Sequence, residues 1–309
     1  MESDAGASAG AGVWQSEPML IADSDLAVAA RQNLDAEAAA TWTGLLRPAV
    51  RLRALSPGEQ VVGYLGGDPL LPESLAWPEW EGQGPLAFVG AIDCGSLPAG
   101  ELDLALPTDG ALLFFYFDGQ VGDDDATVDY WRPESTRGGS RVIYVPAHAE
   151  MTQRQAPEGI TAYPMVPLAA ELIATAPDFE HPSFRAAFGD PYDPDASPSA
   201  QAMVGSSFSA ALDAVRRSRA PYHQIGGYAQ PIQGSAETEA AYGRFSGNDD
   251  EAAKRRGELA GRLVLLAQLG SDGSAGMSWG DTGTLYWLID PDDLAARRFE
   301  AALFTWQSH

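Results

Sequence analysis

Two stretches of sequence, PLAFVGAID at residues 85–93 and RLVLLAQLG at residues 262–270, decide the fold. When they are aligned without a gap, most of their apolar positions coincide. Each is a short apolar run near Gly, Pro or Asp, which is typical of a buried β-strand. The match continues downstream, where GALLFFY at residues 110–116 aligns with GTLYWLI at residues 283–289. The sequence therefore predicts two pairs of buried strands in the same order.

A looser match lies upstream of each pair, where Gly66-Gly67 has a counterpart in Gly226-Gly227. Three blocks that recur in one order predict an internal duplication, with halves at about residues 61–145 and 222–307. The alternative is that short runs of Leu, Val and Phe beside Gly resemble one another by composition alone.

The remaining segments predict helices around these strands. Residues 1–22 are a tail of small and acidic residues, and residues 23–60 are a helical N-terminal extension that ends in a strand-like alternation. Apolar spacing predicts further helices near residues 168–176 and 206–219. We therefore expect an α+β fold with mainly antiparallel sheets and peripheral helices.

The chain of 309 residues has 19 Lys and Arg against 43 Asp and Glu, a formal net charge of -24. Such a field repels nucleic-acid phosphates and anionic lipids, so we expect neither a nucleic acid nor a membrane as partner. A basic protein is the partner that this charge favours. A single cysteine, Cys94, forms no internal disulfide, and we expect a cytoplasmic location.

Several motifs resemble a known family. They are Gly66-Gly67-Asp68-Pro69, Trp77-Pro78, Gly110 to Phe115, Ile225-Gly226-Gly227-Tyr228 with Gln230, and Trp279-Gly280-Asp281. Together they are similar to the bacterial YwqG-like family, a domain family of unknown function, over a domain at residues 61–307. The resemblance implies an α+β fold on antiparallel sheets and brings no established reaction. The chain departs from the family pattern at Cys94 and in the long acidic insertion that follows Gln233, for which the sequence predicts a solvated helix.

Eight residues of these motifs are candidate binding residues. They are Gly66, Gly67, Asp68, Trp77, His223, Gln230, Trp279 and Asp281. Glycine backbone approaches a ligand closely, an indole donates a hydrogen bond, and carboxylate and imidazole groups act as acid or base. The structural alternative is that the glycines form turns, the tryptophans pack on the sheet, and His223 is part of the scaffold.

Other signals favour neither a metal nor a cofactor. The four histidines lack metal-ligand spacing, and the Gly-rich segments lack the Lys and Ser or Thr of a phosphate loop. The pattern Gly276-Met-Ser-Trp-Gly280 leads into a strand, whereas a nucleophile elbow follows one. The acidic runs at residues 123–125 and 249–251 lack the spacing of a calcium loop. We therefore expect no cofactor and no metal site.

Two functional hypotheses follow. The first is a non-enzymatic, intracellular binding protein, such as an inhibitor or immunity-type protein that masks a basic partner. The second is a small-molecule enzyme with carboxylates such as Asp68 and Asp281 in a cleft between the two halves, where they would have to converge with His223.

Overall fold

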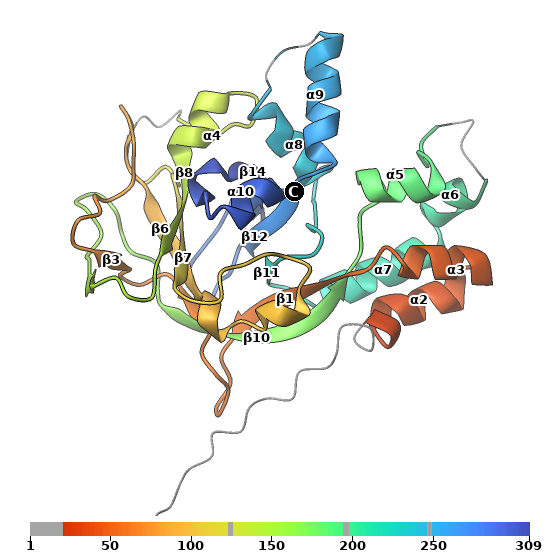
Figure 1. Ribbon diagram of the computed structural model, residues 1–309, viewed down its shortest axis with the longest axis horizontal. Coiled ribbons are helices and arrows are strands. Elements are labelled where there is room, and N and C mark those ends of the chain that lie inside the picture. The colour runs from red at the N-terminus through yellow and green to blue at the C-terminus, as the bar shows by residue number, and fades with distance from the viewer. Residues whose placement is uncertain (1–20, 123–125, 194–197, 246, 248) are drawn as a thin grey trace, which may run out of the picture.

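A computed structural model describes residues 21–122, 126–193, 198–245, 247 and 249–309, so the expected tail at residues 1–22 lies almost wholly outside the described residues. One ten-stranded sheet dominates the chain (Figure 1). In spatial order its strands are β14 (Leu303–Gln307), β13 (Thr284–Ile289), β12 (Val264–Gly270), β11 (His223–Ile225), β1 (Arg47–Ala54), β10 (Val166–Thr175), β2 (Gly63–Leu65), β6 (Ala87–Asp93), β7 (Ala111–Tyr116) and β8 (Ser140–Val145). Two small sheets pair β3 (Leu70–Pro72) with β9 (Met151–Gln153) and β4 (Glu79–Trp80) with β5 (Gly84–Pro85). All pairs in the described residues are antiparallel, as expected.

The central strands β1 and β10 form the longest pair, which runs from Arg47 opposite Thr175 to Ala54 opposite Leu168. The segment expected to be a helical extension, residues 23–60, therefore supplies a central strand of the sheet. The expected helix at residues 168–176 is wrong, because this segment is β10. Its Ala and Glu residues favour a helix locally, but hydrogen bonds to β1 and β2 on both sides outweigh that preference.

The order of the strands is symmetric about the central pair β1 and β10. Moving outward, β10 is followed by β2, β6, β7 and β8, whereas β1 is followed by β11, β12, β13 and β14. The register shifts between Phe88 and Gly90 in β6 and between Leu265 and Ala267 in β12, which are the positions that the sequence alignment superposes. The two predicted strands thus hold matching places in the sheet. The duplication itself stays a prediction.

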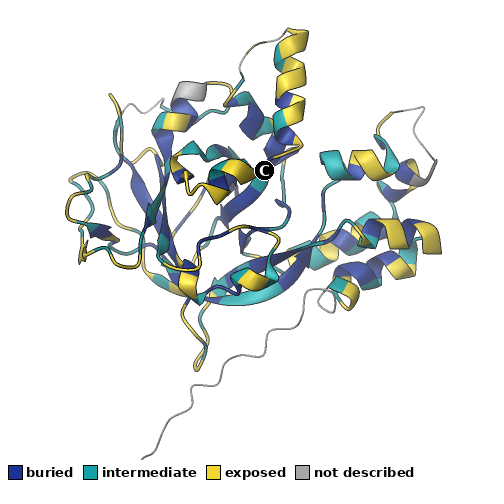
Figure 2. Ribbon diagram, in the orientation of Figure 1, coloured by how far each residue is buried: buried dark blue, intermediate teal, exposed yellow. Residues whose placement is uncertain are grey.

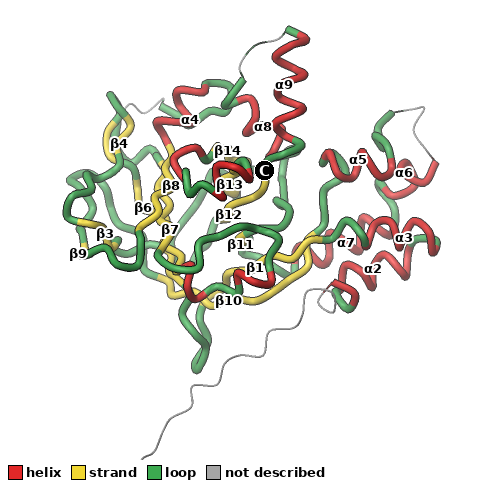
Figure 3. Tube along the Cα trace, viewed as in Figure 1, coloured by secondary structure: helices red, strands yellow, loops and turns green. Residues whose placement is uncertain are grey.

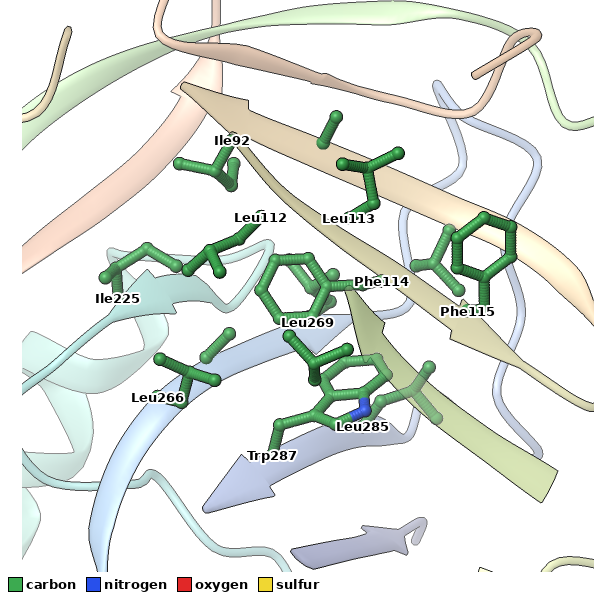
Figure 4. Close-up of a cluster of buried hydrophobic side chains, with 14 of the residues drawn as sticks. Ile92, Leu112, Leu113, Phe114, Phe115, Ile225, Leu266, Leu269, Leu285 and Trp287 are labelled. Atoms are coloured by element: carbon green, nitrogen blue, oxygen red, sulfur yellow. The ribbon is translucent and has the colours of Figure 1, made fainter. Parts of the chain in front are cut away.

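The main core lies between the inner faces of the two ends of this sheet. Figure 4 shows side chains of β6 and β7 opposite those of β12 and β13. Phe114 and Trp287 are fully buried there, with ring centroids 5.1 Å apart. Burial of each large apolar side chain contributes about 1.5–3 kcal/mol, so this shared core stabilises both ends together.

The helices are α2 (Asp25–Asn33), α3 (Ala36–Thr43), α4 (Pro133–Gly139), α5 (Pro182–Phe188), α6 (Pro198–Met203), α7 (Ser207–Arg217), α8 (Ala236–Tyr242), α9 (Asp250–Ala260) and α10 (Pro291–Ala295), with 3-10 turns η1 (Cys94–Ser96), η2 (Ala99–Glu101) and η3 (Phe299–Ala301). Figure 3 shows α2, α3, α5, α6 and α7 grouped to one side of the strands. There they bury a second core, in which Trp42 and Phe208 meet edge to face. The predicted helix near residues 206–219 is confirmed as α7. None of the helices in the described ranges combines the length and apolarity needed to cross a bilayer.

The acidic insertion is divided between two environments. Helix α9 projects into solvent and is largely exposed (Figure 2). Helix α8, in contrast, packs Ala236 and Ala240 against Tyr286 and Leu288 on the outer face of β13. The expected solvated helix of the insertion is therefore α9, whereas α8 is a part of the insertion that packs on the sheet.

Gly227 lies in the turn that follows β11, where the backbone requires a glycine. Its φ is +66°, and a Cβ atom there would lie 2.8 Å from the Cβ of Ala49 and would also overlap Thr175. We expect Gly227→Ala to lower the free energy of unfolding by about 3–5 kcal/mol, since backbone strain and overlap add. Gly58→Ala is the control, because Gly58 has a φ of +90° but open space around it, and it should lose only about 1–2 kcal/mol. Equal losses in urea unfolding would contradict this account.

Candidate functional site

His223 is buried at the start of β11 and is held on both ring nitrogens. Its Nδ1 accepts a hydrogen bond from the Gly270 amide at 3.2 Å, so the ring proton lies on Nε2, which donates to Oδ2 of Asp272 at 3.1 Å. This bond holds the pKa of Asp272 well below its usual range. Asp272 also accepts from the amide and hydroxyl of Ser274. The pair therefore braces the connection after β12.

The two carboxylates of the enzyme hypothesis do not join this pair. Among the described residues, no hydrogen bond or ion pair links Asp68 or Asp281 to His223. Asp281 is exposed, and its carboxylate accepts from the neighbouring Thr282 hydroxyl while its carbonyl accepts from the His309 amide. The three residues thus form no hydrogen-bonded set in the part of the chain that the structure describes.

Gly66, Gly67 and Trp77 have structural contacts. Both glycines have positive φ, and a Cβ at Gly66 would overlap the Pro164 carbonyl. The Trp77 indole donates to the Leu86 carbonyl at 2.8 Å and meets Phe115 edge to face. These residues shape a turn and cover the outer face of β7.

Gln230 and Trp279 carry buried polar atoms that have no hydrogen-bond partner among the described residues. These atoms are Oε1 of Gln230 and Nε1 of Trp279. The backbone amide of Gln230 donates to Gln268, and the Trp279 ring packs between Tyr116 and Tyr163. Since both atoms are closed off from solvent, neither residue presents its unpaired group to an incoming ligand.

The described residues contain no group of three or more His, Cys, Asp or Glu side chains that could hold a metal ion. The acidic run at residues 123–125 lies outside the described residues. Cys94 is buried, and burial raises the pKa of its thiol to about 12. A thiol in this state is a packing group and a poor nucleophile.

An apolar groove that the sequence did not predict lies on the outer face of β2, β6 and β7. Its volume is about 380 Å³. The floor consists of small residues, namely Gly63, Ala91, Gly110, Ala111 and Ala147, and the rim includes Val61, Leu70 and Met151. Asp93 is the one charged residue in this lining. We call this feature the apolar groove.

Residues 64–308 match the profile of a protein family described as a domain of unknown function, DUF1963. This chain belongs to the DUF1963 family. The match covers the sheet from β2 onward and leaves out β1, although β1 lies at the sheet centre. The curated proteins contain no match to the chain. The YwqG-like name stays a prediction.

One buried carboxyl of this DUF1963 protein has an unusual environment. Glu237 on α8 is 3% exposed, accepts from the Ser235 hydroxyl at 2.9 Å, and lies 3.9 Å from Nε2 of His181. Burial, with a smaller contribution from the charge of Asp178, raises the pKa of Glu237 to about 7. Burial and then the charge of Arg47 lower the pKa of His181 to about 4. Near pH 6 both side chains are therefore neutral, and the pair forms no ion pair.

The raised pKa of Glu237 predicts a pH-dependent stability. The folded protein holds this proton more tightly than the unfolded chain, so the stabilisation is complete below about pH 4.5 and is lost as pH rises through 7. Relative to Glu237→Gln, the wild type should lose on the order of 2–3 kcal/mol between pH 5 and pH 8. Because His181 titrates in both proteins, its contribution cancels when the unfolding free energy of the variant is subtracted from that of the wild type.

Urea unfolding of both proteins at several pH values measures this loss. Glu251→Gln, at an exposed position of α9, is the control and should keep the wild-type profile. A wild-type profile parallel to that of Glu237→Gln would show that Glu237 is ionised in the folded protein at neutral pH.

Proposed function

We propose that this protein is a non-catalytic, cytoplasmic interaction protein that masks a basic partner, in the manner of an inhibitor or immunity-type protein. The partner would insert an apolar, positively charged segment into the apolar groove. The observation that carries this proposal is the groove itself, whose lining is apolar apart from the carboxylate of Asp93 and the hydroxyl of Tyr64.

The exposed apolar residues of the rim support a docking role. Val61, Leu70 and Met151 are 49%, 44% and 38% exposed, and they line one continuous surface. Apolar side chains that gather at one exposed place are typical of an interaction site, whereas scattered ones are not. Burial of this rim under a partner would supply the affinity.

The small floor gives the groove its depth. At the corresponding strand positions of the other half, His223, Gln268, Thr284 and Tyr286 replace Gly63, Ala91, Ala111 and Leu113. In that half, the larger side chains and the segment that contains Gln230 occupy the equivalent space. The Tyr286 hydroxyl donates a hydrogen bond to the Gln230 carbonyl at 2.8 Å. Side chains of a partner would take the equivalent space above β2, β6 and β7.

Charge selects the partner. Among the described residues, no Lys, Arg or His lines the groove. Asp93 lies within it, and the exposed Glu150 adjoins Met151 in sequence. The net charge of -24 attracts a basic segment over long range, and salt weakens this attraction because the Debye length is only about 8 Å at physiological ionic strength.

A labelled peptide of alternating Leu and Lys residues tests the proposal by fluorescence anisotropy. We expect saturable binding, with an association rate that falls steeply as salt rises. A Ser-Lys peptide of equal charge should bind at least tenfold more weakly, and a Leu-Glu peptide should not bind. The double variant Leu70→Ser, Met151→Ser should weaken Leu-Lys binding at least tenfold, or about 1.4 kcal/mol.

Tyr192→Ser is the matched control, because Tyr192 is 57% exposed and does not line the groove. It should bind the Leu-Lys peptide as the wild type does. If the groove variant also binds like the wild type, the apolar groove is not the docking site.

We also propose that the two halves of the sheet arose by duplication. The matching strand order and the matching register shifts in β6 and β12 support this origin. Under this proposal, the two halves have diverged on their outer faces, and the half with the smaller side chains holds the apolar groove.

A further inference from the structure

A second pocket, of about 310 Å³, lies where the two ends of the sheet approach each other. One wall comes from α4 and β8, with Arg137, Arg141 and Val142. The other comes from η3 and β14, with Phe299, Glu300 and Phe304. We call it the end-strand pocket. It is separate from the apolar groove, and the two linings share no residue.

Contacts between the two ends hold the walls of this pocket in place. The ring centroids of Tyr144 on β8 and Phe299 on η3 are 5.5 Å apart. Arg297 donates from Nη1 to the Tyr144 hydroxyl at 3.0 Å and lies 3.7 Å from Asp109. These contacts link the two ends of the sheet beside the pocket.

Two arginines of the pocket form no ion pair with a side chain that the structure describes. Neither Arg137 nor Arg141 lies within ion-pair distance of a described carboxylate, although Glu300 lines the same pocket. Arg141 is partly buried, and Nη1 donates to the carbonyl of Ser140. Burial lowers its pKa. Partial burial of a cation without an anion is unfavourable, so an anion in the pocket would stabilise it.

A structural role accounts for the charge of Arg137 but not for that of Arg141. Arg137 lies in the last turn of α4, where a cation stabilises the helix end. Arg141 lies on β8 and has no such role. In a chain with 19 basic and 43 acidic residues, two arginines at one cavity that form no ion pair with any described carboxylate indicate a place for negative charge.

We propose that the end-strand pocket binds a small organic anion. Its carboxylate or phosphate group would lie between Arg137 and Arg141, which match oxyanions through charge and paired N–H donors. Its apolar part would lie against Val142 and Leu303. This proposal does not depend on docking at the apolar groove.

Isothermal titration with two probes, phenyl phosphate and benzoate, tests it and distinguishes the two oxyanions. We expect saturable one-to-one binding of at least one probe and none of benzyl alcohol, which is neutral. Arg141→Gln and Arg137→Gln should each weaken binding at least tenfold. Glu300→Gln should strengthen binding at least twofold, because it removes the nearby negative charge.

Two further variants keep the test sharp. Arg217→Gln is the matched control, because Arg217 is an exposed arginine in the last turn of α7, and it should leave binding unchanged. Ala302→Phe fills the pocket without a change of charge and should abolish binding. This variant tests the pocket even if Arg141→Gln fails to fold. Absence of saturable binding of both probes, or binding that Ala302→Phe and Glu300→Gln leave unchanged, would overturn the proposal.

Discussion

The rest of the structure depends on the contact between the inner faces of the two sheet ends, at the centre of which Phe114 packs against Trp287. Both side chains are fully buried, and Phe304 of the end strand β14 contacts Trp287 with ring centroids 5.3 Å apart. Each end alone would expose one face of its strands to water. The central pair β1 and β10 connects the two ends, so one core stabilises both.

Both candidate sites follow from this arrangement. Because the inner faces bury each other, each outer face must be covered separately. Helix α8 covers the outer face of β13, whereas Trp77 covers only part of the outer face of β7 and leaves the apolar groove beside it. The end strands β8 and β14 meet through η3 and α4, and the end-strand pocket lies between them. One site thus derives from an uncovered face and the other from the junction of two ends.

Periodicity predicted the strands whose apolar runs are short and bounded by turn residues, and the alignment of residues 85–93 with 262–270 predicted their matching places. It failed at residues 168–176, where sheet pairing outweighed local helix preference. The candidate residues were found as motifs, yet their roles depend on long-range contacts such as that of His223 with Asp272. The apolar groove was missed because Gly63 and Ala91 are small, and an empty volume leaves no pattern in a sequence.

Native-state hydrogen exchange tests the shared core most directly. In the wild type, the amides of β6 and β7 and those of β12 and β13 should exchange with the same opening free energy, equal to that of global unfolding. Phe114→Leu removes part of the contact from one side, and the account predicts an equal fall in protection for both strand pairs. If β12 and β13 keep their wild-type protection while β6 and β7 lose theirs, the two ends are independent units and the account is contradicted.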